Sequence, residues 1–270
     1  MGADIKSLRS RIRSVDSTLH LTKAMGLVAS SKIRRATRDM NRTQEYVAAM
    51  DNVVDLLRAA PECERSPYMQ PSGEGIRLIV IAGDRGLAGG YNANVFRLAA
   101  TVKDAEVIAI GKRACDRFGQ EVISSEKVPA GKTKEIADRL CHDFVEGKYG
   151  KLGILYTRYR SMLSQEATLK WVLPLEKTEK TGKAEPIFEP DEQTVLNGAV
   201  PTYVSGLISA CIRESFACEV AARRMAMDSA GKNAQEMIDR LQLQYNRARQ
   251  NSITQEITEI VAGSGAGDNR

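Results

Sequence analysis

Hydrophobic positions in the first 57 residues recur with the spacing of a coiled-coil seam. Alternating steps of three and four from Ile5 reach sixteen positions, of which eleven are large and apolar, three are small and two are threonine. These positions are Ile5, Leu8, Ile12, Val15, Leu19, Thr22, Gly26, Ala29, Ile33, Ala36, Met40, Thr43, Val47, Met50, Val54 and Leu57. A 3.5-residue repeat of this length predicts one helix roughly 80 Å long, which needs a partner helix to bury its apolar seam.

A second long helix is predicted near the C-terminus. Pro201 suits the first turn of a helix, and helical periodicity continues from there to about Val261. The glycines at positions 263 and 265 are expected to end this helix. Because the two predicted helices are similar in length, we expect them to pair with each other in antiparallel orientation.

Between these helices the pattern changes to short apolar runs that alternate with helical segments. Pro61 and the linker 62–75 precede the change. Strands are expected at 76–82, 106–111, 121–125, 151–159 and 167–175, and helices at 92–101, 112–118 and 133–146. This alternation predicts a mostly parallel sheet, and the short connection between the last two strands makes that pair antiparallel.

The predicted fold class is therefore α/β: a long antiparallel coiled coil of the N- and C-terminal helices with an inserted Rossmann-like α/β domain. We expect the coiled-coil helices at residues 1–60 and 201–262 and the inserted domain at 76–195.

Composition narrows the class of protein. Hydrophobic residues make up 43% and charged residues 27% of the chain, as in ordinary soluble proteins, and apolar stretches such as 78–82 are too short to cross a bilayer. The N-terminus begins with a charged amphipathic pattern, so no secretory signal is expected. Five cysteines without a CxxC spacing predict reduced thiols in the cytosol, without a disulfide framework or a zinc site.

The net charge of +5 is concentrated in the first helix. Residues 1–58 contain eleven Lys and Arg residues against six Asp and Glu residues. The densest basic run, 32–38, has three possible interpretations: a solvated helix face, a nucleic-acid contact, or a basic shaft inside an acidic-lined protein sleeve. Charge alone does not separate them.

No catalytic constellation is evident. The glycine-rich turn 83–90 follows a strand and precedes a helix, which suits a phosphate cradle, but its spacing fits neither GxGxxG nor GxxxxGK[ST]. Gly131 begins a GKT sequence that resembles the end of a P-loop, yet Glu126 stands where a P-loop needs glycine. His20 and His142 lie on separate elements. We therefore expect no catalytic residue, no metal site and no cofactor, and a tight surface turn at 83–90.

Four segments resemble the γ subunit of F-type ATP synthase. Residues 12–15 (IRSV) and 21–32 (LTKAMGLVASSK) are similar to its opening helix, and 84–92 (DRGLAGGYN) resembles its DRGLCGGLN turn. Residues 188–191 (FEPD) are similar to its YEPD sequence, and 245–260 (YNRARQNSITQEITEI) to its C-terminal signature. The matches follow the family's order from end to end of the chain.

The resemblance implies the fold already predicted, and also a role. It implies a non-catalytic central-stalk rotor of the F1Fo complex, one copy per hexamer of α and β subunits, with the nucleotide sites on those subunits. It implies contacts with the ε subunit and with the ring of membrane c subunits, whose proton-driven rotation the rotor transmits for ATP synthesis. A bacterial protein bound peripherally to the cytoplasmic side of the cell (inner) membrane, only through the c ring, is the simplest expectation.

The resemblance also implies contact residues. Expected contacts with the β subunit are Lys23, Met25, Ala88, Arg223, Arg249, Gln250, Thr254, Glu256 and Glu259. Expected contacts with the c ring or ε subunit are Phe188, Glu189 and Asp191. Gly26 and Arg224 depart from the family's usual residues. The basic run 32–38 would face acidic levers on β through exposed ion pairs, each worth about 0–1 kcal/mol, weak enough to exchange during rotation.

Two other functions are compatible with parts of the pattern. A nucleotide-dependent α/β enzyme with a helical arm would hydrolyse or tightly bind nucleotide as an isolated chain. A basic coiled-coil protein that binds nucleic acid would show salt-dependent affinity for DNA or RNA.

Overall fold

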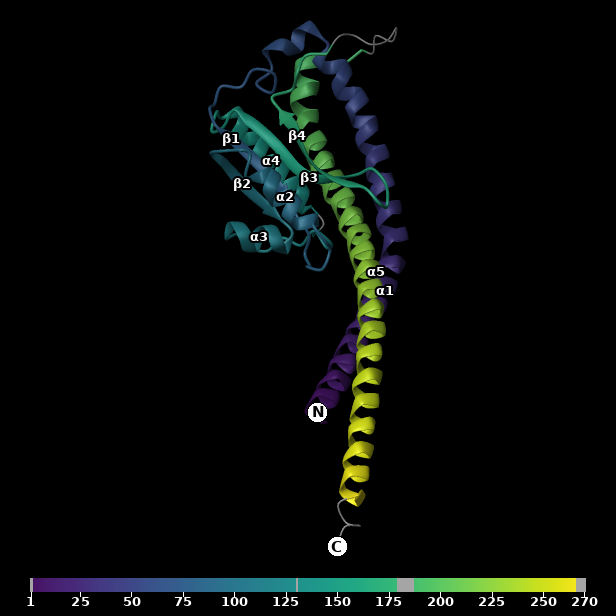
Figure 1. Cartoon of the computed structure of the whole chain (residues 1–270). Helices are drawn as coiled ribbons and strands as arrows, with labels where there is room; N and C mark the ends of the chain where they lie inside the picture. The colour runs from purple at the N-terminus through teal and green to yellow at the C-terminus, as the bar shows by residue number, and fades with distance from the viewer. Residues whose placement is uncertain (1, 130, 179–186, 266–270) are drawn as a thin grey trace. The chain divides into compact units, whose positions relative to one another are not determined.

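The computed structural model describes residues 2–129, 131–178 and 187–265. The chain forms two compact units, one of residues 29–223 and one that combines residues 1–28 with residues 224–270. The two longest helices, α1 (Gly2–Arg58) and α5 (Glu192–Gly265), contribute to both units (Figure 1).

In the unit that contains both termini, α1 and α5 pack as an antiparallel pair. Leu19 is 5% exposed and packs against Ala234 and Ile238. Further along α1, the backbone at Gly26 approaches Met227, which lies earlier on α5. Because the partner number falls as the α1 number rises, the helices run in opposite directions. The predicted antiparallel pairing and its seam are confirmed.

Replacing Leu19 with alanine should loosen this helical pair. We expect a loss of about 2–4 kcal/mol of local stability, because a buried leucine is truncated against a helix that cannot collapse around the cavity. Leu21, two residues away and 60% exposed, provides the matched control, for which Leu21→Ala should cost less than about 0.5 kcal/mol. Hydrogen exchange of the α1 backbone amides measures both; equal protection in the two variants would contradict the packing.

A four-stranded sheet forms the centre of the unit of residues 29–223. Its order is β2 (Ala105–Ile110), β1 (Ile76–Ile81), β3 (Lys151–Tyr159) and β4 (Gln165–Leu173). β1 pairs in parallel with β2 and with β3, whereas β4 is antiparallel to β3. The predicted sheet, including its antiparallel last pair, is confirmed.

Helices cover both faces of the sheet. The helices of the insert are α2 (Tyr91–Ala99), α3 (Lys112–Phe118) and α4 (Lys132–Val145), preceded by a 3-10 turn at Pro61–Arg65. Ile79 and Ile81 of β1 point into a core shared with α4, α5 and the end of α1. Leu78 and Val80, on the opposite face, pack against α2 and α3. The alternation of side chains along β1 thus produces a Rossmann-like arrangement.

The expected strand at 121–125 was wrong. Only one backbone hydrogen bond ties this segment to the end of β2, from Gly111 N–H to the carbonyl of Ile123 at 2.7 Å. The N–H groups of Ser125 and Glu126 donate instead to the carboxylate of Asp84. A segment whose donors point at a side chain cannot form a strand ladder.

The second long helix begins at Glu192 rather than at the predicted Pro201. Asp191 caps it, because its carboxylate accepts the N–H of Thr194 at 2.8 Å and the hydroxyl of the same residue at 2.7 Å. Pro201 therefore lies inside the helix, where it removes one backbone donor while the neighbouring apolar residues stay buried in the core. Part of α5 is long and apolar enough to resemble a membrane span, but 56% of that window is buried in the protein, as expected of a core helix.

All five cysteines are buried, and all are free thiols. Burial raises the pKa of Cys63 to about 11 and the pKa of Cys141 to about 12. The predicted reduced thiols are therefore found in the interior of the protein.

Candidate functional site

The glycine-rich turn between β1 and α2 is held by a side chain from the first turn of α2. The N–H of Gly83 donates to Oδ1 of Asn92 at 2.9 Å, and Nδ2 of Asn92 donates to the carbonyl of Arg85 at 3.3 Å. The Asn92 amide therefore ties the first part of the turn, at Gly83 and Arg85, to the start of α2. With this donor already used, the turn matches a tight surface turn better than a phosphate cradle.

Asp84 ties this turn to the next two segments at the same edge of the sheet. Its Oδ1 accepts the N–H groups of Lys112 at 2.9 Å and Ser125 at 3.0 Å. Its Oδ2 accepts the Ser124 hydroxyl at 2.6 Å and the Glu126 N–H at 2.9 Å. Burial by itself would raise the pKa of Asp84, but these four hydrogen bonds together outweigh it and hold that pKa below its usual value.

Because its pKa is lowered on folding, Asp84 stabilises the protein in a pH-dependent way. The stabilisation is complete above the pKa of an unfolded aspartate, about 3.9, and is lost as pH falls through the lower folded pKa. Asp84→Asn should therefore cost about 1–3 kcal/mol at pH 7, and the difference from the unmodified chain should shrink in acid. Urea unfolding of the two proteins at pH 7 and in acid tests this. Asp116→Asn, at an exposed position, is the control; if it shows the same pH-dependent difference, the carboxylate network is not the cause.

The loop that Asp84 holds is also connected to α1. Lys32 Nζ lies 2.5 Å from Oε1 of Glu126, and Arg85 of the turn lies 3.8 Å from the other carboxylate oxygen of Glu126. Glu126 thus lies between a cation of the long helix and a cation of the turn. Lys32, which we expected on a basic face toward a partner, is used inside the chain.

A second set of contacts fastens the turn to α5. Nε and Nη2 of Arg223 donate to the carbonyl of Gly86 at 3.4 and 3.3 Å, and the same guanidinium pairs with Glu219 one helical turn earlier. The side chain of Glu219 is 3% exposed. A Cβ at Gly83 would lie 2.7 Å from Cδ of Glu219, so a larger residue there would push the Glu219 carboxylate from its position. The turn is therefore held by both long helices.

The structure places two of the expected β-subunit contacts at this turn. Ala88 is 3% exposed and packs against Tyr91 and Cys218, and Arg223 is half-buried. The exposed apolar side chain of the turn is Leu87, at 63%, whose backbone has a φ of 59°. Sequence reasoning missed Leu87, because a left-handed conformation at leucine has no local signal.

The other expected β contacts lie in the unit that contains both termini. Lys23 is exposed and Met25 half-buried on α1. The remaining five residues are all exposed on the final stretch of α5; they are Arg249, Gln250, Thr254, Glu256 and Glu259. Of these, Glu256 and Glu259 accept hydrogen bonds from residues one turn earlier on α5.

The expected contacts with the c ring or ε subunit flank the start of α5. Phe188 packs against the core of the insert, Glu189 is exposed, and Asp191 serves as the helix cap. Of the two departures from the family pattern, Arg224 is exposed. A Cβ at Gly26 would make ordinary contact at 3.7 Å from Met227, so packing tolerates but does not require glycine there.

The remaining candidate groups do not form a reactive site. His20 and His142 each lie near a carboxylate one turn away on an exposed helix face. Over the residues that the structure describes, no group of three or more His, Cys, Asp or Glu side chains could hold a metal ion.

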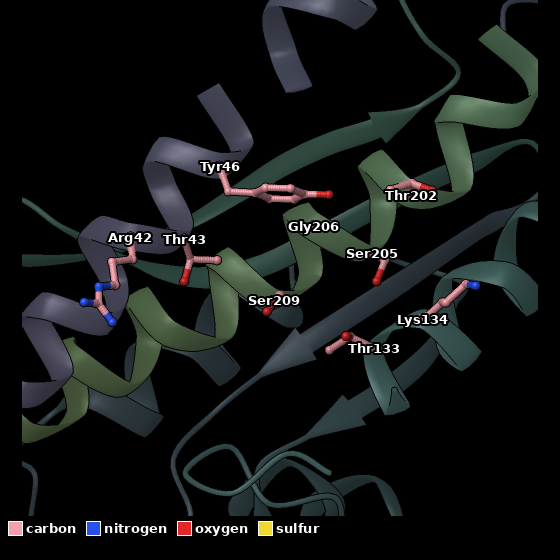
Figure 2. A pocket seen from close by; sticks show the side chains of 9 residues that line it. All are labelled: Arg42, Thr43, Tyr46, Thr133, Lys134, Thr202, Ser205, Gly206 and Ser209. Carbon is pink, nitrogen blue, oxygen red and sulfur yellow. The ribbon is translucent and has the colours of Figure 1, made fainter. Parts of the chain in front are cut away.

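A pocket of about 540 Å³ lies between α1, α5 and the start of α4 (Figure 2). Its lining is made of hydroxyls, two cations, a tyrosine and a glycine; these residues are Arg42, Thr43, Tyr46, Thr133, Lys134, Thr202, Ser205, Gly206 and Ser209. Gly206 makes room for the Tyr46 ring, since a Cβ there would lie 2.9 Å from Cε1 of the ring. None of the nine lining residues is a histidine, carboxylate or thiol that could serve as a base for the hydroxyls.

The described residues thus form two long helices with an α/β insert between them in the chain, a fold found in the central stalks of ATP synthases. The cryo-EM structure of Euglena gracilis mitochondrial ATP synthase (OSCP/F1/c-ring, rotational state 3) contains a chain similar to this one, with a TM-score of 0.73 and 17% identity over 98% of this chain and 95% of that chain. The central stalk and c-ring structure of Tetrahymena thermophila mitochondrial ATP synthase contains another, with a TM-score of 0.61 and 18% identity over 78% of this chain and 99% of that chain. These likenesses show a shared fold.

Sequence similarity gives the family. The sequence model of the ATP synthase family matches residues 4–266. The ATP synthase gamma chain of Ruminococcus albus is 38% identical over 97% of this chain and 98% of its own length, and that of Moorella thermoacetica is 36% identical over 98% and 99%. The chain belongs to the family of F-type ATP synthase γ subunits.

Proposed function

We propose that this chain is the central-stalk rotor of an F1Fo ATP synthase and transmits rotation of the membrane c ring to the catalytic hexamer of α and β subunits. The observation that carries the proposal is the end of α5. Leu19 packs against Ala234 and lies seventeen positions after Gly2, where α1 starts. Because the helices are antiparallel, the residue of α5 opposite Gly2 lies seventeen positions after Ala234, at Asn251. Beyond this point the register carries α5 past the start of α1.

The end of α5 beyond Asn251 is apolar along one face. Ile253, Ile257 and Ile260 are 45%, 56% and 71% exposed, and their spacing places them on one side of the helix. Apolar side chains at this spacing favour burial in a surrounding protein, and a sleeve made by the α and β subunits would supply it. The proposed β contacts on this stretch, from Arg249 to Glu259, lie among them.

The proposal includes the partners and the location. One copy of the chain would serve each hexamer of α and β subunits, which hold the nucleotide sites, so the chain itself would be non-catalytic. Its foot, with Phe188, Glu189 and Asp191, would contact the ε subunit and the c ring. The membrane contact would be made only through that ring, on the cytoplasmic side of the cell (inner) membrane, and no nucleic acid would bind. In this proposal α1 and α5 are the two coiled-coil helices, and the strands and helices between them form the inserted domain.

Co-purification with the α and β subunits tests the proposal. We expect a complex with three α, three β and one copy of this chain by native mass spectrometry, and rotation-coupled ATP hydrolysis by that complex. Ile257→Ser should weaken the association several-fold, whereas Leu163→Ser, at a 76% exposed position in the β3–β4 turn, should not. ATP hydrolysis by the isolated chain, or salt-dependent binding to DNA or RNA without assembly, would overturn it.

A further inference from the structure

Four hydrogen-bond donors converge on one carboxylate beyond the end of β1. Each oxygen of Asp84 accepts two of them: backbone N–H groups of Lys112 and Ser125 on Oδ1, and the Ser124 hydroxyl with the Glu126 N–H on Oδ2. Three of the four donors are main-chain groups, from Lys112, Ser125 and Glu126, so a substitution at position 84 removes their acceptor and leaves the donors themselves in the chain.

This cluster lies where ligands bind in other sheets of this kind. β1 is flanked by β2 on one side and β3 on the other, so its carboxyl end lies where the order of the parallel strands reverses. In doubly wound sheets, ligands bind in the crevice at that place. Converging backbone N–H groups form anion-binding concavities in many phosphate sites.

A further donor borders the same cluster. Ser125 is 1% exposed, and its hydroxyl has no hydrogen-bond partner among the described residues, although its own N–H is bound to Asp84. Two other carboxylates lie near Asp84, and both are paired: that of Glu126 with Lys32, and that of Glu219, which approaches Gly83, with Arg223. The surroundings therefore supply more donors than the chain uses and leave no free negative charge to repel an anion.

We propose that this edge of the sheet is an anion-binding site whose resident ligand is the chain's own Asp84 carboxylate, and that a small oxyanion can replace that carboxylate. Formate and acetate offer the same pair of oxygens on one carbon, and one edge of a phosphate offers an equivalent pair. The chain thus supplies from its own sequence the negative charge that other proteins obtain there from a bound phosphate.

Chemical rescue of the purified full-length chain tests the site. In KCl, Asp84→Gly and Asp84→Ala should both unfold at a lower temperature than the unmodified chain, because the donors lose their acceptor. Sodium formate, acetate or phosphate at the same ionic strength should raise the midpoint of both variants saturably, in the millimolar range, and leave the unmodified chain unchanged. Comparing the three anions shows whether a carboxylate or a phosphate fits better.

Two controls separate replacement of the carboxylate from a general salt effect. Asp84→Asn fills the same space but turns an amide N–H toward the donors, so formate should not rescue it. Asp116→Ala removes an exposed carboxylate and should not respond. If Asp84→Gly or Asp84→Ala fails to fold in KCl, its refolding yield in formate is compared with that in KCl. A higher yield in formate then supports the site. No recovery beyond KCl, or equal recovery of Asp84→Asn, would overturn the proposal.

Discussion

Replacing Gly111 with alanine should cost about 4 kcal/mol or more and disrupt the insert. Gly111 precedes α3 with a φ of 93°, and a Cβ there would lie 1.9 Å from the carbonyl oxygen of Ala82. That oxygen belongs to a fully buried backbone, whose N–H is bound to the carbonyl of Ile110 at 2.9 Å. Neither backbone can move away without breaking the end of the sheet, so the clash cannot be relieved locally.

Gly75 provides a matched control for the conformation alone. Its φ is 94°, nearly the same as that of Gly111, but nothing lies within 4 Å of a Cβ built there. Gly75→Ala should therefore cost only the strain of a left-handed alanine, about 1–2 kcal/mol. Urea unfolding followed by circular dichroism compares the two variants. If both variants lose the same free energy of unfolding, the close approach to Ala82 is not the reason that position 111 requires glycine.

Removing Arg223 should cost about 3–5 kcal/mol, because Arg223→Ala leaves the buried carboxylate of Glu219 without its cation. It also removes both hydrogen bonds to the carbonyl of Gly86, which hold the turn on α5. Glu219→Ala should be costly for the converse reason, since it leaves the half-buried guanidinium unpaired. The double variant should lose less than the sum of the two single losses, and the difference measures the coupling of the pair.

An exposed ion pair with the same spacing on α5 is the control for this double-mutant cycle. Arg240 and Glu236 are four residues apart, at 3.9 Å, and their side chains are 80% and 67% exposed. Arg240→Ala should change the unfolding free energy by no more than about 0.5 kcal/mol. If Arg223→Ala is equally mild in the isolated chain, the internal role is wrong, and any loss of ATPase coupling in the complex would point to a direct contact with a partner.

The parts of the fold that could be predicted depend on local periodicity. The seam from Ile5 to Leu57 has sixteen positions, so polar or small residues at a few of them, such as Thr22 and Gly26, do not obscure it. The start of α5 and the segment 121–125 depend on a few hydrogen bonds to single side chains, and there the predictions were wrong. Asp191 caps α5 so that the helix begins at Glu192, nine residues before the predicted start at Pro201.

The candidate site was only partly predictable. The segment 84–92 was recognised from the family motif, but its fastening depends on residues far away in the sequence. Lys32 and Glu126 are 94 positions apart, and Gly86 and Arg223 are 137 positions apart. No spacing rule connects such residues until the fold brings them together. The same holds for Asp84, whose carboxylate accepts N–H groups of Ser125 and Glu126 that a strand at 121–125 would have needed.

The buried thiols make this chain convenient for optical measurements. A thiol must ionise to react quickly, and burial both raises the pKa of Cys63 and Cys141 and keeps reagents away from all five cysteines. A cysteine introduced at an exposed position such as Leu163 would then be the one fast-reacting thiol of the protein. A fluorophore attached there would report the orientation of the insert during single-molecule recording, with the natural cysteines left in place.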